Sequence, residues 1–351
     1  MAFIIIISLY AIFILVLLFG FLRLKNIQED VKINNFISVI IAVRDEQNLD
    51  KLLADLSRQQ YSSYEVIVVD DHSSIPPNTQ FIPNRGQGKK AAIATGIASA
   101  KGEIIVTTDG DCRVTPQWLT GINKGFQQVG VKMLVGGVRI EEERSFFSKL
   151  QSLEFVSVAA TGAATIGLGF PTMCNGANLA YRRSAFYEVN GFEGNENISS
   201  GDDEFLMNKF DNRSVKYLYS NDCLVTASPI PRLISFLSQR LRWAGKWSVN
   251  TSLKTRLFAV IVFGFHLAFV AALLNILLGF VALKISLIVL LAKALVETVL
   301  LYPASEFFRI KWRWIPFFTL QLVYPVYVIS IGLLSQVVLP KWKGRTVETK
   351  V

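Results

Sequence analysis

Two aspartates one residue apart, Asp109 and Asp111, follow an apolar run in the segment IIVTTDGDCR at residues 104–113. The β-branched residues before them predict a strand, so both carboxylates are expected at a strand end. Two carboxylates this close repel each other unless a proton or a cation lies between them. Hard divalent cations take carboxylate oxygen and commonly bridge to substrate phosphates. Asp-Gly-Asp is also good turn sequence, so the pair alone leaves both a metal site and a solvated turn open.

The elements around this pair alternate between strands and helices. The segments 36–46 and 65–74 each begin as an apolar strand and end in charged residues, and 88–102 reads as an Ala-rich helix. A helix between the first two strands is predicted by the spacing of Leu49, Leu52, Leu53 and Leu56. Strand–helix–strand order predicts a parallel sheet, in which ligands bind beyond the carboxyl ends of the strands. Asp70 and Asp71, which end the second strand, are therefore expected to share one cleft with the first acidic pair.

Two further motifs place charge at predicted helix starts. Lys89 and Lys90 would suit a diphosphate there, although a basic helix start beside an acidic cleft also gives simple charge balance. In GDDEFLMNKF at 201–210, Asp202 and Asp203 precede apolar residues at helical spacing. The helix dipole favours carboxylates at that end and keeps an aspartate ionised, as a general base must be. Simple N-capping is the alternative explanation.

The segment PRLISFLSQRLRWAGKWSVN at 231–250 predicts an amphipathic helix that lies in the membrane interface. Gln239, Arg242 and Lys246 fall on its polar half, and the first two are expected to face the soluble domain. Arg240 falls on the apolar arc, where we expect its side chain to snorkel toward water. Anchoring to anionic lipid alone remains a second explanation for this helix.

Four apolar stretches are long enough to cross a bilayer, which needs about 20 apolar residues. Three of them contain no charged residue: 1–22, 257–283 and 314–340. The fourth, 285–301, contains only Lys293 and Glu297, which can pair on one helix face. With a formal net charge of +9 and 51% hydrophobic residues, the chain is expected to be an integral membrane protein with one soluble domain.

Basic residues predict the orientation, because they favour the cytoplasmic side of a membrane. Positive residues follow the first span, at Arg23, Lys25 and Lys32, and separate the last two spans, at Arg309, Lys311 and Arg313. The soluble domain is therefore expected in the cytoplasm. The tail 341–351 is also basic, yet a simple final crossing would put it outside, and Pro325 within the last stretch leaves that conflict open. Three cysteines at unrelated spacings do not predict a disulfide framework, which agrees with a reducing compartment.

Taken in order, these motifs resemble the membrane-integrated glycosyltransferase family 2, which includes cellulose, chitin and hyaluronan synthases and ceramide glucosyltransferase. The resemblance covers residues 36–247 and rests on VIIAVRDE, VVDDHSS, Lys89 in GKKAA, DGD, GANLAYRR, GDD in place of the more usual Thr-Glu-Asp, and QRLRW as Gln-x-x-Arg-Trp. It implies an α/β GT-A catalytic domain with a Rossmann-like mixed sheet, plus one N-terminal and several C-terminal transmembrane helices. The expected parts are an anchor (1–22), a linker (23–35), the GT-A domain (36–230), an interfacial helix region (231–256), transmembrane segments (257–340) and a basic tail (341–351).

The resemblance also implies roles for individual residues. Donor nucleotide-sugar contacts are implied for Glu46, Asp70, Asp71, Lys89, Asp109, Gln239, Arg242 and Trp243. Asp109 and Asp111 would hold Mg²⁺ or Mn²⁺ with the diphosphate, and Lys89 with Arg242 would stabilise charge on that leaving group. The catalytic residues would be Asp203, Asp202 and Arg242, with Asp203 as the base that deprotonates an acceptor hydroxyl. The acceptor end would be formed by Trp243, Gly176 and Asn178.

The expected function is therefore an inverting, metal-dependent glycosyltransferase that moves a sugar from a nucleotide-diphospho-sugar to a membrane-associated lipid or glycan acceptor. Its partners are these two substrates and the cell membrane, without nucleic acid. A processive polysaccharide synthase is the alternative within the family, although three or four spans are few for a pore. A haloacid-dehalogenase-type phosphatase with Asp109 as nucleophile and a non-catalytic nucleotide-binding regulator are the alternatives of other classes.

Overall fold

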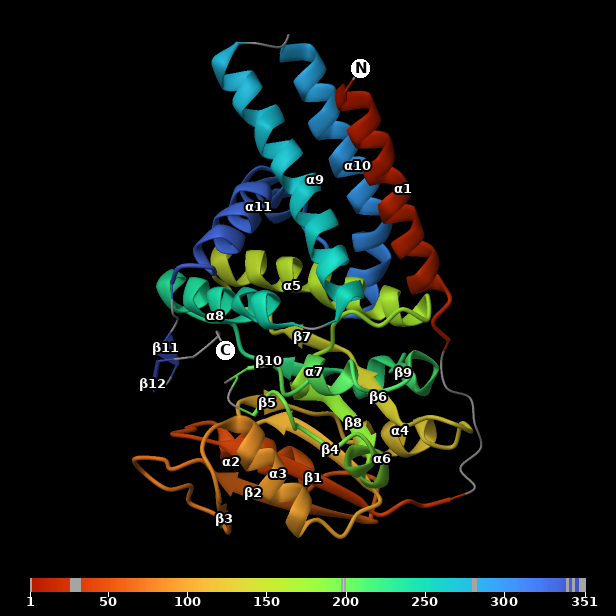
Figure 1. The fold of residues 1–351 in the computed structure, drawn as a ribbon, viewed down its shortest axis with the longest axis vertical. Coiled ribbons are helices and arrows are strands. Elements are labelled where there is room, and N and C mark those ends of the chain that lie inside the picture. Colours follow the sequence, from red (N-terminus) through yellow and green to blue (C-terminus); the bar gives the residue numbers. More distant parts are fainter. Residues whose placement is uncertain are drawn as a thin grey trace.

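The computed structural model describes residues 2–25, 33–196, 198, 200–250, 252–279, 283–338, 341–342 and 345–346. A soluble α/β domain lies at one end and a group of long helices at the other, with helices α5 and α8 between them (Figure 1). These two connecting helices are α5 (Phe146–Gly167) and α8 (Leu233–Gly245).

The soluble domain is built on a seven-stranded mixed sheet with the strand order β3-β2-β1-β4-β8-β6-β9. Its strands are β1 (Ile37–Val43), β2 (Tyr64–Asp70), β3 (Ile82–Pro83), β4 (Ile104–Asp109), β6 (Met133–Gly136), β8 (Leu179–Arg182) and β9 (Val215–Leu218). Strands β1, β2 and β4 are parallel, with Val43 opposite Asp70 and Ala42 opposite Asp109. The two acidic strand ends therefore meet at one edge of the sheet, as the sequence predicts. A smaller sheet beside it contains β5 (Cys112–Arg113), β10 (Val225–Ala227) and β7 (Val138–Ile140).

Helices cover both faces of the large sheet because side chains on successive strand residues point to opposite faces. On β1, Val39 and Ile41 pack with α2 (Leu49–Leu56) and α4 (Trp118–Gly125), whereas Ile40 packs with α3 (Lys89–Ser99) and α5. The remaining short helices are α6 (Arg183–Glu188), α7 (Glu204–Met207), η1 (Gly176–Asn178), η2 (Asn212–Ser214), η3 (Asn221–Cys223) and η4 (Lys246–Val249). The predicted strands and helices of the first hundred residues of this domain are thus confirmed.

Among the described residues, four helices are long and apolar enough to cross a membrane: α1 (Ala2–Leu22), α9 (Leu253–Leu278), α10 (Leu283–Phe307) and α11 (Trp314–Leu334). Helix α1 crosses α5 at very close range. A Cβ atom on Gly20 would lie 2.3 Å from the carbonyl oxygen of Ala164, and one on Gly167 would lie 2.0 Å from the carbonyl oxygen of Gly20. Small residues permit such close approach of two backbones, so these glycines allow α1 to pack directly against α5.

Helix α11 contacts the α5–α8 layer along much of its length. Just before its start, Arg313 lies 3.7 Å from Glu142. Farther along, the Tyr327 hydroxyl donates to Glu154 on α5 (3.4 Å), and the Tyr327 ring stacks on Phe236 of α8. If α11 were a straight helix that left this layer at Arg313, Tyr327 would lie about 20 Å away from the layer instead of in contact with it. Helix α11 therefore runs along the layer, and Figure 1 places β11 (Lys341–Trp342) and β12 (Arg345–Thr346) beside the soluble domain.

Candidate active site

A cleft of about 460 Å³ lies beyond the carboxyl ends of β1 and β4. Side chains expected at the site that line it are Glu46, Asp71, Lys89, Asp109, Asp111, Gly176, Asp202, Asp203, Gln239, Arg242 and Trp243. These residues come from strand ends, from helix starts and from α8, so segments more than a hundred residues apart converge on one cavity.

Lys89 lies between the two acidic groups of the cleft. Its Nζ is 2.7 Å from Oδ1 of Asp109 and 3.2 Å from Oδ2 of Asp202. Burial lowers the pKa of Lys89, but Asp109 and Asp202 more than compensate, so its pKa lies above the ordinary value. As the first residue of α3, Lys89 also stands at the positive end of the helix dipole. Lys89 thus supplies a positive charge beside Asp109, one of the two neighbouring aspartates Asp109 and Asp111 whose carboxylates would otherwise repel each other.

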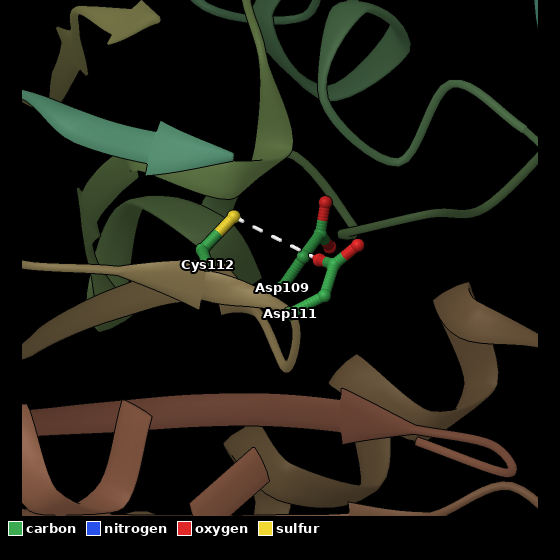
Figure 2. Close-up of side chains that lie close together, drawn as sticks. All are labelled: Asp109, Asp111 and Cys112. Atoms are coloured by element: carbon green, nitrogen blue, oxygen red, sulfur yellow. Dashed lines mark hydrogen bonds between the residues drawn. The ribbon is translucent and has the colours of Figure 1, made fainter. Parts of the chain in front are cut away.

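The carboxylates of Asp109 and Asp111 form a candidate cation site together with Cys112 (Figure 2). Ligand atoms of the three residues lie within 4.8 Å of one another. Burial, followed by the charges of Asp109 and Asp111, raises the pKa of the Cys112 thiol well above its ordinary value. The thiol therefore keeps its proton, lies 3.9 Å from Asp111 as a weak donor, and is a poor metal ligand. The two carboxylates are the oxygen donors that Mg²⁺ or Mn²⁺ prefers, so they fit such an ion.

Asp203 caps α7 and is held by backbone amides. Its Oδ1 accepts from the N–H of Glu204 (2.7 Å) and its Oδ2 from the N–H of Gly176 (3.1 Å). Lys246 Nζ lies 3.6 Å from Asp203 and 3.5 Å from Glu204. Burial raises the pKa of Asp203, but Lys246 and the amide donors outweigh it, and the resulting pKa lies below the ordinary value. Asp203 is therefore ionised at neutral pH, as a base must be.

Replacing Lys246 by methionine is expected to move the acid limb of activity to higher pH. Lys246 is the strongest influence that lowers the pKa of Asp203, so its loss raises that pKa, and Asp203 becomes protonated earlier as pH falls. The pH dependence of kcat/KM measures this shift, because it reports the pKa of the free enzyme's essential base. Lys246→Arg should keep the limb near its wild-type position. An unchanged limb in Lys246→Met would mean that Asp203 does not control it.

Glycine is required at position 176 because the backbone there lies close to the side chains of Asp202 and Asp203. A Cβ atom on Gly176 would lie 2.8 Å from Oδ2 of Asp202, too close without displacement. The carbonyl of Gly176 also accepts from the Thr107 hydroxyl on β4 (2.8 Å). Gly176 therefore connects β4 to the start of α7 and fixes where Asp203 lies.

Three expected residues do not line the cleft. Asn178 is buried, with Oδ1 accepting from Trp118 Nε1 and Nδ2 donating to two backbone carbonyls, so it braces the sheet and does not reach an acceptor. The Asp70 carboxylate accepts from the hydroxyl and the backbone N–H of Ser73, so its side chain is directed to the loop after β2 and does not line the cleft. The Lys90 ammonium donates to the carbonyl of Asn195 (2.6 Å), so of the two lysines at the start of α3 only Lys89 meets the cleft.

Asp71 and Glu46 line the cleft, and Asp71 is buried. Asp71 Oδ1 accepts from the N–H of Gly88 (2.9 Å) and from Asn84 Nδ2 (2.8 Å), so it orders the loop that leads into Lys89. Glu46 follows β1 and accepts from the N–H of Asn48 (3.1 Å). Both residues thus line the cleft next to the carboxyl ends of β1 and β2.

Helix α8 presents Gln239 and Arg242 to the cleft, as the amphipathic pattern predicts. The prediction that Arg240 snorkels is wrong. Its Nη2 lies 2.6 Å from Glu154 on α5, and both side chains are buried. Arg240 also lies over the Trp243 ring, 4.2 Å from its centroid, which fixes the indole beside the cleft.

The sequence pattern did not identify Lys246 and Glu154 as site residues. Lys246, which directly follows α8, shares the polar half of the helix predicted over 231–250 with Gln239 and Arg242, and that shared face was the signal for it. Glu154 lies in the middle of α5, where no local pattern distinguishes it from a solvated glutamate.

Comparison with known proteins shows the family to which the chain is similar. The sequence matches the profile of glycosyl transferase family 21 over residues 83–350, more than half of the chain. Glycosyltransferase AglE of Haloferax volcanii is 31% identical over 48% of this chain and 59% of its own length. The undecaprenyl-phosphate 4-deoxy-4-formamido-L-arabinose transferase of Aeromonas hydrophila is 30% identical over 35% of this chain and 42% of its own. The chain thus spans about half the length of these curated relatives.

Among solved structures, mannosyltransferase PcManGT from Pyrobaculum calidifontis, in complex with GDP-Man and Mn²⁺, superposes with a TM-score of 0.62. The two chains are 17% identical, and the superposition covers 96% of each. At this identity the likeness shows a shared fold, and it extends over both the soluble domain and the long helices. The predicted GT-A fold is confirmed.

Proposed function

The chain belongs to glycosyl transferase family 21 and is therefore a glycosyltransferase, and from that premise we propose its reaction. It moves a sugar from a nucleotide-diphospho-sugar to a hydroxyl of a lipid or lipid-linked acceptor, with inversion at the anomeric carbon and with Mg²⁺ or Mn²⁺. The observation that carries this proposal is the ion-paired set of Lys89, Asp109 and Asp202 beside Asp203 in one cleft.

The residues that would bind the donor are inferred from the charged groups in the cleft. Asp109 and Asp111 would hold the divalent ion, which when bound neutralises charge on the donor diphosphate. Lys89 lies 2.7 Å from Asp109 and Arg242 lines the same cleft, and both can donate to phosphate oxygens. Preorganised positive groups of this kind stabilise charge that develops on the leaving group in the transition state.

The activation of the acceptor hydroxyl is inferred from the position of Asp203. The acceptor oxygen forms a bond to the anomeric carbon while the bond from that carbon to the diphosphate oxygen breaks, and the nucleoside diphosphate leaves with the electron pair. The acceptor's proton passes to the carboxylate of Asp203, which its two amide donors hold in place. A single displacement of this kind inverts the anomeric centre.

A lipid acceptor is supported by α8, which lines the cleft and packs against the long apolar helix α11, and by relatives whose names specify undecaprenyl phosphate. Asp203 favours a hydroxyl over a phosphate as the attacking group, because a phosphate is already ionised and needs no base. A phosphatase or a non-catalytic regulator gains no support from the family match, and a processive synthase is distinguished by product length.

Incubating detergent-purified protein with total lipid extract, Mn²⁺ and a panel of nucleotide sugars tests this proposal. We expect one labelled lipid that carries a single added sugar, formed from one donor and lost on chelation of the metal. Long saccharide products would instead identify a processive synthase. Release of phosphate without a glycosylated product would contradict glycosyl transfer.

We also infer that the catalytic domain and the C-terminal tail face the cytoplasm, since Arg23, Lys25 and the basic residues before α11 favour that side. Because α11 returns to the α5–α8 layer through Tyr327, we expect a tag after Val351 to share a compartment with a tag in the exposed loop at Ile75. Protease accessibility of both tags in sealed, oriented vesicles measures this. Protection of only one of them would mean that α11 crosses the membrane.

A further inference from the structure

A second cavity, of about 600 Å³, lies among the membrane helices α1, α9, α10 and α11 and the two layer helices α5 and α8. Its walls are mostly apolar, with Phe13, Leu17, Phe258, Phe263 and Leu320 among the side chains that line it. A cavity of this size falls within the range of about 300–1,000 Å³ that small-molecule sites occupy. We call it the membrane cavity.

The membrane cavity adjoins the catalytic cleft. Val158, Met173, Arg240 and Trp243 line both spaces. The Arg240 guanidinium is fixed by Glu154 and by the Trp243 ring, so the border between the two spaces is ordered by a buried ion pair. An amphiphile with its chain in the membrane cavity would therefore present its head to the cleft across Trp243.

One wall of the membrane cavity carries a buried polar atom without a partner. His266 on α9 is 4% exposed, and its Nδ1 lies 2.8 Å from the carbonyl oxygen of Val262. A carbonyl only accepts, so Nδ1 carries the proton and Nε2 of the neutral ring is an acceptor. Among the described residues this Nε2 has no hydrogen-bond partner. Buried polar atoms are normally satisfied, so the cavity is suited to an occupant with a hydroxyl or amide donor.

We propose that the membrane cavity binds the hydrocarbon chain of the acceptor lipid, and that a second donor group of that lipid bonds to His266. This inference rests on the proposed function, because it assigns the chain of the lipid acceptor to a place beside the cleft. The apolar walls favour a hydrocarbon chain over a glycan. The border shared with the cleft favours the acceptor over a bilayer lipid that has no access to Asp203.

Photocrosslinking tests the binding without any sugar transfer. The probe is a long-chain lipid alcohol with a diazirine near the end of its chain, added to the full-length protein in detergent. Label is expected in the peptides that contain Thr161, His266 and Tyr324, which line the cavity from three different helices. Hexadecanol should compete for this label and hexanol should not. Label spread over the lipid-exposed faces of α9 and α11, without competition, would overturn the proposal.

A substitution that fills the cavity gives the second test. Thr161 lines the membrane cavity but not the cleft, so Thr161→Phe adds volume only where the chain is expected. The matched control, Val323→Phe, adds similar bulk on an exposed face of α11 that lies outside the cavity lining. For acceptors short enough to dissolve as monomers, each methylene that moves from water into the cavity is worth about a fourfold change in affinity. Wild type and the control should therefore show a KM that falls as the acceptor chain lengthens, and Thr161→Phe should lose that dependence.

The two proposals fail separately. Cavity labelling without a glycosylated lipid would support the membrane cavity and contradict the lipid acceptor. Transfer to lipid with a KM that ignores chain length in the wild type would support the proposed function and overturn the membrane cavity. An unfolded Thr161→Phe would leave the crosslinking of the wild type to decide.

Discussion

The Asp203→Asn variant is expected to bind donor nucleotide sugar with wild-type affinity and to lose sugar transfer by about 10²–10⁴-fold, the usual contribution of a general base. The physical reason is that asparagine keeps one carbonyl oxygen, which can accept from the N–H of Glu204, but it loses the acceptor for the N–H of Gly176 and has no basic carboxylate. Lys246 retains Glu204 as an ion-pair partner, so the local charge remains partly balanced.

Nucleotide-sugar binding by calorimetry and single-turnover transfer to the lipid acceptor measure these two effects separately. The control is Asp50→Asn, which removes an exposed carboxylate in the first turn of α2 that does not line the cleft. If Asp203→Asn turned over like Asp50→Asn, Asp203 would not be the base.

The Lys89→Met variant is expected to lower kcat by about 10²–10³-fold, as the loss of one preorganised group that stabilises developing negative charge typically does. In the same variant, affinity for Mn²⁺ alone should rise. Lys89 lies 2.7 Å from Asp109 and competes with a metal ion for that carboxylate, so removing the ammonium leaves the acidic pair more attractive to the ion.

Steady-state kinetics and manganese titration by electron paramagnetic resonance give the two readouts. Opposite changes distinguish this role from a purely structural one, in which activity and metal affinity would fall together. Lys51→Met, on an exposed position of α2, serves as the control. Unchanged kcat in Lys89→Met would exclude Lys89 from the reaction.

Local sequence was enough to find the acidic edge of the sheet. Apolar runs that end in Asp70 and Asp109 predict parallel strands, and parallel strands necessarily bring their carboxyl ends to one edge. The position of Asp203 at a helix start and the polar face of α8 followed from helical periodicity. These features depend only on residues a few positions apart.

Features that depend on distant partners were not accessible in the same way. Arg240 was expected to reach water because nothing near it in sequence reveals Glu154 on another helix. Asn178 lies two residues after Gly176 in a loop-like segment, yet its amide bonds to Trp118 and to the backbone carbonyls of Gly137 and Cys223. The return of α11 through Tyr327 depends likewise on contacts with α5 and α8, which hydropathy does not encode.

The central claim is that carboxylates from separate segments converge on one cation and the diphosphate it neutralises. Anomalous scattering from crystals of the protein grown with Mn²⁺ and a nucleoside diphosphate tests it most directly. We predict one manganese ion in contact with carboxylate oxygens of Asp109 and Asp111, with Lys89 and Arg242 donating to the diphosphate. A diphosphate bound elsewhere, with both aspartates turned away from the metal, would contradict the account.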